Sequence, residues 1–144
     1  IKGVDAVLNA LFTLGKLEVT TKFQYTYQKA IDITDPADTY YRDQIPYIPW
    51  HSGSAVLNAA WRSWEVSYSF IYTGERYSSQ ANIPYNYQLP WYTSDFSLAK
   101  GWHVGKGDLK TTLEVNNLLN QQYEVVACYP MPGTNFKLII QYTF

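Results

Sequence analysis

Apolar and polar residues alternate with a period of two along several segments of this chain, most regularly in its last nine residues, FKLIIQYTF. A period of two places successive side chains on opposite faces of a β-strand. On the polar side of this segment, only Ile139 is apolar. The apolar side consists of Phe136, Leu138, Ile140, Tyr142 and Phe144. The segment therefore predicts an amphipathic strand.

The same alternation recurs in six earlier segments, so the chain is predicted to be all-β, with about seven antiparallel amphipathic strands. A content of 17% aromatic residues, with 14 Tyr, agrees with this, because aromatic side chains favour strands. No segment shows a helical period. The six earlier strands are expected at residues 4–14, 17–28, 54–61, 64–73, 94–104 and 109–117.

Short and long connections alternate strictly between these strands. The short ones are Gly15-Lys16, Arg62-Ser63 and a glycine turn at residues 105–108. The long ones are expected at residues 29–51, 74–90 and 124–135. This order places every tight turn at one end of the sheet and every long loop at the other. Outer-membrane barrels have this layout, with periplasmic turns and longer extracellular loops.

Alternation alone leaves open whether the apolar face meets lipid or a soluble core. The positions of the aromatic residues favour lipid, because they form two groups of the kind found at membrane interfaces. The group near the short turns is Trp61, Trp64, Trp102, Tyr142 and Phe144. The group near the long loops, expected on the same apolar face, is Tyr25, Tyr27, Tyr72, Trp91 and Tyr92.

Seven strands cannot form a barrel of this class, because such barrels have an even number of strands and tolerate no open edge in lipid. We therefore expect further strands upstream of Ile1, with residues 1–144 as one piece at the C-terminal end of a larger barrel.

Two segments near the C-terminus resemble the corresponding part of TonB-dependent outer-membrane receptors. VNNLLNQQYE is similar to the N-L-F-N-x-x-Y pattern of the family's penultimate strand, with Leu119 in place of Phe. YPMPGTNF is similar to the following YPMPGR-x-[FY] segment, with Thr134 in place of Arg. QIPYIPWHS and YTGERY also resemble the family, although Trp50 replaces a frequent basic residue. The motif residues are Asn117, Leu118, Asn120, Tyr123, Pro130, Pro132 and Gly133.

The resemblance implies energy-coupled uptake of a scarce nutrient through a 22-stranded barrel in the cell outer membrane of a Gram-negative bacterium. It implies an N-terminal plug domain that engages TonB, and the style of the motifs is closer to the siderophore and cobalamin branches than to the glycan branch. It also implies that the apolar face of the last strand, ending in Phe144, is a recognition signal for the barrel assembly machinery. The expected partners are thus outer-membrane lipid, the chain's own plug, TonB, that machinery and a small-molecule nutrient.

Six tyrosines and one arginine in the long loops are the predicted ligand-binding residues, because Tyr and Arg give large contact areas in recognition sites. The alternative is that they pack the loops together or lie at the membrane interface. They are Tyr40, Tyr41, Arg42, Tyr77, Tyr85, Tyr87 and Tyr129.

No sequence pattern indicates an enzyme, a cofactor or a metal site. His51 and His103 are expected at opposite ends of the sheet, and Cys128 has no basic neighbour that would activate its thiol. A net charge of −1 and the lack of a basic cluster argue against nucleic-acid binding. The competing hypotheses are a small outer-membrane barrel with a structural or adhesive role, and a soluble all-β binding module.

Overall fold

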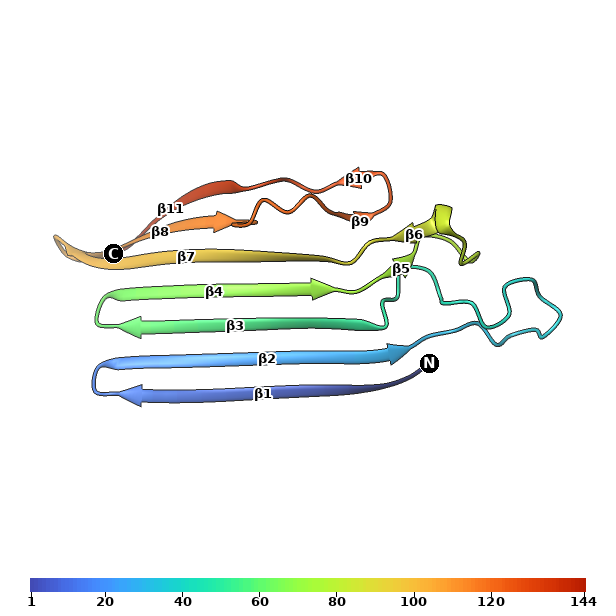
Figure 1. Ribbon diagram of the computed structural model, residues 1–144. Coiled ribbons are helices and arrows are strands. Elements are labelled where there is room, and N and C mark those ends of the chain that lie inside the picture. Colours follow the sequence, from blue (N-terminus) through green and yellow to red (C-terminus); the bar gives the residue numbers. More distant parts are fainter.

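The computed structural model describes all 144 residues. Seven long strands form one antiparallel sheet in the order β1-β2-β3-β4-β7-β8-β11 (Figure 1). The predicted all-β fold with seven antiparallel strands is confirmed. The strands are β1 (Lys2–Leu14), β2 (Leu17–Lys29), β3 (His51–Trp61), β4 (Trp64–Thr73), β7 (Trp91–Val104), β8 (Gly107–Asn116) and β11 (Asn135–Thr143).

Strand pairing keeps most apolar residues of these strands on one face; exceptions include Val7, Leu11, Ile71 and Ile139. In one row across five strands, Leu57 lies opposite Tyr68, Tyr68 opposite Phe96, Phe96 opposite Val115, and Val115 opposite Phe136. Directly paired residues in an antiparallel sheet point to the same side. The alternation read from the sequence is therefore the real division between an apolar and a polar face.

The tight turns and the long loops lie at opposite ends of the sheet, which we call the turn end and the loop end (Figure 1). Each tight turn has two residues and begins with a positive φ: 62° at Gly15, 57° at Arg62 and 65° at Gly105. Primed hairpin turns require a positive φ at this position because their twist then matches that of the strands. The third turn, expected at residues 105–108, is shorter than predicted because β8 already begins at Gly107.

The sheet has no hydrophobic core. Of the 144 residues only eight are buried, and the only hydrophobic side chains among them are those of Ala30 and Ala99, which are small. Large side chains along the apolar face, such as Phe12 and Leu138, are exposed. A soluble sandwich would cover this face with a second sheet, whereas the structure has a single layer. The sheet is instead held by its backbone ladder, because 68 of 84 backbone hydrogen bonds lie within the regular elements.

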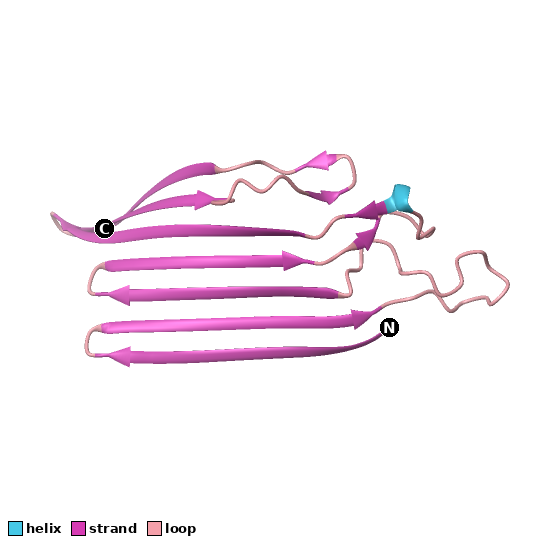
Figure 2. Ribbon diagram, in the orientation of Figure 1, coloured by secondary structure: helices cyan, strands magenta, loops and turns pink.

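The long loops contain short elements that the sequence did not reveal (Figure 2). The second loop (residues 74–90) holds β5 (Arg76–Tyr77), the 3-10 helix η1 (Pro84–Asn86) and β6 (Tyr87–Gln88). The third loop (residues 117–134) holds β9 (Glu124–Val126) and β10 (Tyr129–Pro130). The first loop (residues 30–50) has no long element. None of the chain's helical structure is long and apolar enough to span a membrane.

Two details of the sequence interpretation are wrong. The third loop was expected at residues 124–135, but it begins at residue 117, where Asn117 has a φ of 50° and ends the extended backbone of β8. Trp91 lies at the loop end, as expected, but on the polar face, because it pairs with Thr73 and not with an apolar-face residue. Its neighbour Tyr92 takes the apolar position opposite Tyr72.

Candidate functional site

The first two loops are joined by the side chain of Asn82. Its Oδ1 accepts a hydrogen bond from the backbone N–H of Gln44 at 2.7 Å, and its Nδ2 donates to the Gln44 carbonyl at 3.1 Å. The Asn82 N–H donates in turn to Oδ2 of Asp43 at 3.1 Å. A backbone hydrogen bond from Tyr47 N to the Tyr77 carbonyl, 2.8 Å long, adds a second link. The two loops therefore hold each other in place.

The side chain of Gln44 lies inside this junction between the first two loops and forms further contacts there. Its side chain is buried, and its Nε2 donates to the carbonyl of Ile48 at 2.7 Å. The same nitrogen lies 3.4 Å from the Glu75 carbonyl, in the second loop. Buried amides need such partners because an unpaired one loses its hydrogen bonds to water. The first loop is thus folded around Gln44.

Arg76 joins the second loop to the third. Arg76 is 3% exposed, and its guanidinium donates from Nη2 to the carbonyls of Glu124, at 2.6 Å, and Val125, at 3.2 Å. Nη1 donates to the Leu89 carbonyl at 3.4 Å. Burial lowers the pKa of Arg76. No carboxylate forms an ion pair with it, so backbone carbonyl dipoles are the acceptors that compensate its charge.

The start of the third loop is folded around Asn117. Its buried side chain donates from Nδ2 to the carbonyls of Gln121 (2.9 Å) and Pro132 (3.1 Å), and accepts from the Gln121 N–H at 2.9 Å. Its own N–H donates to Oδ1 of Asp95, on β7, at 2.8 Å. One asparagine therefore ties both ends of the loop to each other and to the sheet.

The rest of the motif serves the same junction. Oδ1 of Asn120 accepts from the Thr134 N–H at 3.1 Å, and Thr134 Oγ1 donates to the Asn117 carbonyl at 2.8 Å. A Cβ on Gly133 would lie 2.6 Å from Asn120 Oδ1, so only glycine fits there without displacing it. These contacts give a structural reason for asparagine and glycine at the motif positions.

Tyr123, the last residue of that motif, packs against the sheet. Its ring lies on Trp91 with the ring centroids 4.6 Å apart. Burial raises the pKa of the Tyr123 hydroxyl, and the nearby Asp95 carboxylate raises it further. This pair occupies the polar face at the loop end, which explains why Trp91 points there.

Two cavities of about 270 Å³ each border the joined loops. The first lies between the first and second loops, and its wall combines isoleucines with two carboxylates, Asp32 and Asp43. A hydrogen bond from Thr34 lowers the pKa of Asp32, which keeps that carboxylate ionised. The second cavity lies between the second and third loops and includes Trp91, Tyr123 and Gln122. Both could hold a small molecule by apolar contact and a few hydrogen bonds.

The predicted ligand-binding residues are spread over the three loops, and the structure brings only some of them together. Tyr77 and Tyr87 meet edge to face with their centroids 5.7 Å apart. Tyr87 also donates its hydroxyl proton to Glu75 at 2.8 Å, which raises the pKa of Tyr87. Tyr85 and Tyr129 project freely, 91% and 70% exposed.

The remaining three candidates lie on the first loop. Tyr40 lines the first cavity, whereas the Arg42 guanidinium lies over the Tyr41 ring, 5.5 Å from its centroid. Arg42 itself is exposed. Their role in binding therefore stays a prediction.

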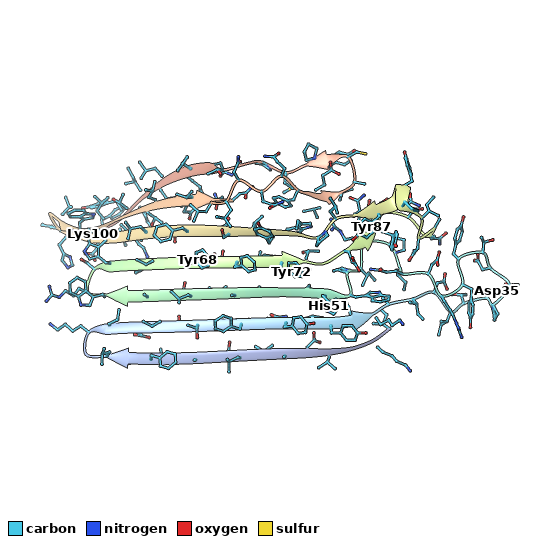
Figure 3. The ribbon with its side chains drawn as sticks, viewed as in Figure 1. Asp35, His51, Tyr68, Tyr72, Tyr87 and Lys100 are labelled. Carbon is cyan, nitrogen blue, oxygen red and sulfur yellow. The ribbon has the colours of Figure 1, made fainter.

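The two histidines lie at opposite ends of the sheet, as predicted. Nδ1 of His51 is hydrogen-bonded to the Tyr25 hydroxyl at 2.7 Å, at the loop end (Figure 3). His103 contacts Asp108 beside the third tight turn. Cys128 is exposed and unpaired. No group of three or more His, Cys, Asp or Glu side chains lies close enough to hold a metal ion.

Sequence reasoning missed the residues that join the loops. Arg76 lies within YTGERY, one of the segments that resemble the family, and this was the only signal in the sequence that could have drawn attention to it. Gln44 and Asn82 are separated by 38 residues and carry no pattern that would connect them. Their importance appears only when the loops are seen together.

A comparison with protein families decides the identity of this fold. Residues 1–118 match the family described as "TonB dependent receptor-like, beta-barrel". The chain belongs to the TonB-dependent receptor family. No match was found among curated proteins.

The TonB-dependent receptor family consists of outer-membrane receptors and transporters. The seven-stranded sheet is thus a segment of such a receptor barrel, with its two outer strands, β1 and β11, unpaired on one side. The family match ends at residue 118, just inside the third loop. The Asn117 junction lies directly at this boundary.

Proposed function

We propose that this chain forms the wall and part of the extracellular gate of a receptor that imports a scarce nutrient across the outer membrane, driven by TonB. The family match over residues 1–118 carries the proposal. The imported nutrient is a ferric siderophore, haem, cobalamin or a similar compound, with the siderophore and cobalamin classes favoured by the motifs. Further strands upstream would pair with β1 and β11 and close the barrel, since lipid tolerates no open edge.

In this receptor the apolar face meets lipid and the polar face lines the lumen. The exposure of Phe12, Leu113 and Leu138 without any covering layer supports this assignment. The opposite face carries polar contacts of the kind that a wet interior permits. Examples are the Lys110–Glu65 ion pair, 2.6 Å long, and the 2.7 Å hydrogen bond from Ser67 Oγ to Asn58 Oδ1. This lumenal surface is where an N-terminal plug would dock.

The joined loops would act as the ligand-facing rim. Their hydrogen bonds to each other through Asn82 and Arg76 hold the backbone, while Tyr85 and Tyr129 remain free to contact a ligand. A rigid support with exposed aromatic side chains reduces the entropy lost on binding. The two cavities beside them supply concave surface for the same ligand.

The test is uptake by the complete receptor in a Gram-negative host. Radiolabelled iron would be offered as hydroxamate siderophore, catecholate siderophore or haem, and radiolabelled cobalt as cobalamin, with and without TonB. We expect accumulation of one compound that is lost without TonB, and weaker binding of it after Tyr85→Ser or Tyr129→Ser. Tyr68→Phe, on the apolar face in the middle of β4 and away from the loops, is the control.

A structural or adhesive barrel is the alternative. It would show no TonB-dependent accumulation of any of these compounds, and its removal would change envelope integrity or attachment instead. That pair of results would overturn the transport proposal.

A further inference from the structure

Three lysines lie on the apolar face of the sheet: Lys2 and Lys29 at the loop end, and Lys100 alone at the turn end. Lys100 of β7 pairs with Trp64 of β4 on one side and with Thr111 of β8 on the other, so its side chain leaves from the lipid-facing side in this fold. It lies at the turn end (Figure 3). A cation on this surface is tolerated near the membrane interface and unfavourable at mid-depth.

Two indole rings hold the ammonium group of Lys100. Nζ is 4.3 Å from the centroid of Trp64 and 4.1 Å from that of Trp102. Each ring attracts a cation through its negative face. This clamp fixes the position of the charge but accepts none of its three N–H protons. Nζ forms no ion pair and no hydrogen bond with any other group of the chain.

The residues around Lys100 leave it uncompensated. Its neighbours on the apolar face are Leu98 and Trp102 along β7, and Trp64 and Thr111 across the strands. None is acidic. The nearest acid in sequence, Asp95, lies opposite Ser69 on the polar face. Glu65 and Asp108 also lie on the polar face, where they contact Lys110 and His103. Arg62, whose guanidinium is 4.7 Å from the Trp61 ring centroid, adds a second cation at this end.

An open groove of about 570 Å³ begins at this lysine. Six of its nine lining residues are hydrophobic. Leu98, Leu109 and Leu113 form its floor between β7 and β8. A positive group at the rim of an apolar groove matches a molecule with an anionic head and a hydrocarbon tail.

We propose that Lys100 and this groove form a binding site for one anionic phospholipid of the leaflet that the short turns face. The lipid phosphate would accept hydrogen bonds from Lys100 Nζ, and an acyl chain would lie along Leu98, Leu109 and Leu113. The occupant is assigned by charge complementarity, since a zwitterionic lipid would also bring its own cation to the clamp. This inference rests on the outer-membrane location given under the proposed function.

The test uses native mass spectrometry of the complete receptor, supplied with equal amounts of phosphatidylglycerol and phosphatidylcholine. We expect one phosphatidylglycerol to be retained in preference to phosphatidylcholine. Lys100→Gln should lower this preference about fivefold, the effect of losing one cation near a membrane surface. Lys100→Arg should retain it, because the guanidinium keeps the charge and the ring contacts.

Two controls separate the site from general attraction. Lys16→Gln removes a cation from another tight turn at the same end, and should leave the preference unchanged. Excess inorganic phosphate, or glycerophosphoglycerol without acyl chains, should not displace the lipid, because the acyl chain in the groove contributes to its binding. Displacement by either compound would contradict a role of the groove. Heat-modifiable gel migration confirms that each variant forms a barrel.

Equal retention of the two lipids by the wild type, or an unchanged preference in Lys100→Gln, would overturn the lipid site while leaving the receptor proposal intact. Failure of the wild-type receptor to insert into vesicles of either lipid would instead contradict the membrane location itself.

Discussion

Nη2 of Arg76 donates to the backbone carbonyl of Glu124 at 2.6 Å, so one side chain of the second loop holds the third loop by its backbone. The same nitrogen reaches the Val125 carbonyl at 3.2 Å. Such a contact depends on the length and planarity of the guanidinium and not on the sequence of the loop it holds. The gate proposed for this receptor would therefore have a defined shape before ligand arrives.

Arg76→Ala should loosen the third loop. Removal of the guanidinium deletes the hydrogen bonds to the Glu124 and Val125 carbonyls, and hydrogen bonds of a charged donor contribute about 1.5–3 kcal/mol. Hydrogen exchange in residues 117–134 should accelerate at least roughly tenfold. Arg42→Gln, at an exposed arginine of the first loop, is the control and should not change exchange there. Unchanged protection in Arg76→Ala would show that the guanidinium contacts do not hold the loop.

Asn117→Ala should open the same loop by a different route. The substitution removes three side-chain hydrogen bonds and places alanine at a φ of 50°, where it is strained by roughly 1–2 kcal/mol. Asn117→Gly loses the same hydrogen bonds without the strain, so it should be cleaved more slowly by protease between residues 118 and 134 than the alanine variant. Asn86→Ala, in the second loop, should leave those cleavage rates unchanged. Equal resistance of all three variants would contradict the role of Asn117.

Alkaline pH should weaken the contact between Tyr123 and Trp91. Because burial and Asp95 raise the Tyr123 pKa, the folded loop favours the protonated phenol. This contribution to stability is present below the unfolded tyrosine pKa of about 10 and is lost as pH rises through the higher folded value. Cleavage of the third loop by an alkaline protease should therefore accelerate above about pH 10. Tyr123→Phe should show less of this acceleration, whereas Tyr129→Phe should behave as the wild type; identical pH profiles for all three would refute the assignment.

Deletion of Phe144 should impair insertion of the complete receptor into the outer membrane. Phe144 continues the apolar face of β11 and is fully exposed, as a residue read by the barrel assembly machinery would be. Phe144→Tyr, which keeps an aromatic ring, should insert normally. Molecules of the deletion variant that do assemble should bind ligand as before, since the loops are at the other end. Normal insertion of the deletion variant would exclude the signal role.

The sheet could be predicted from the sequence because strand alternation and turn residues are local properties. The pairing of Trp61 with Trp64 around Arg62-Ser63 follows directly from two amphipathic segments separated by two residues. The loop end could not be predicted in this way. Arg76 and Glu124 are separated by 48 residues, and their contact is between a side chain and a backbone carbonyl, which any residue provides.

The face of Trp91 was misread for a related reason. An aromatic residue at the start of a strand fits the expected interfacial group, and only its pairing with Thr73 shows that it points the other way. The hydrophobic character of Trp91 did not indicate its face, because the residue that it packs against, Tyr123, lies in a loop on the polar side of the sheet. Only the strand register gives the face.

The two-residue turns at Gly15, Arg62 and Gly105 have a consequence for how such a protein can change. A connection with no spare residue fixes the offset between neighbouring strands, and an offset of one residue would exchange the lipid-facing and lumenal sides. Insertions and deletions are therefore confined to the other end, where the connections have slack. The molecule can acquire a new binding specificity there without any adjustment of the wall, which makes its loop end the natural place to graft an epitope or a recognition peptide.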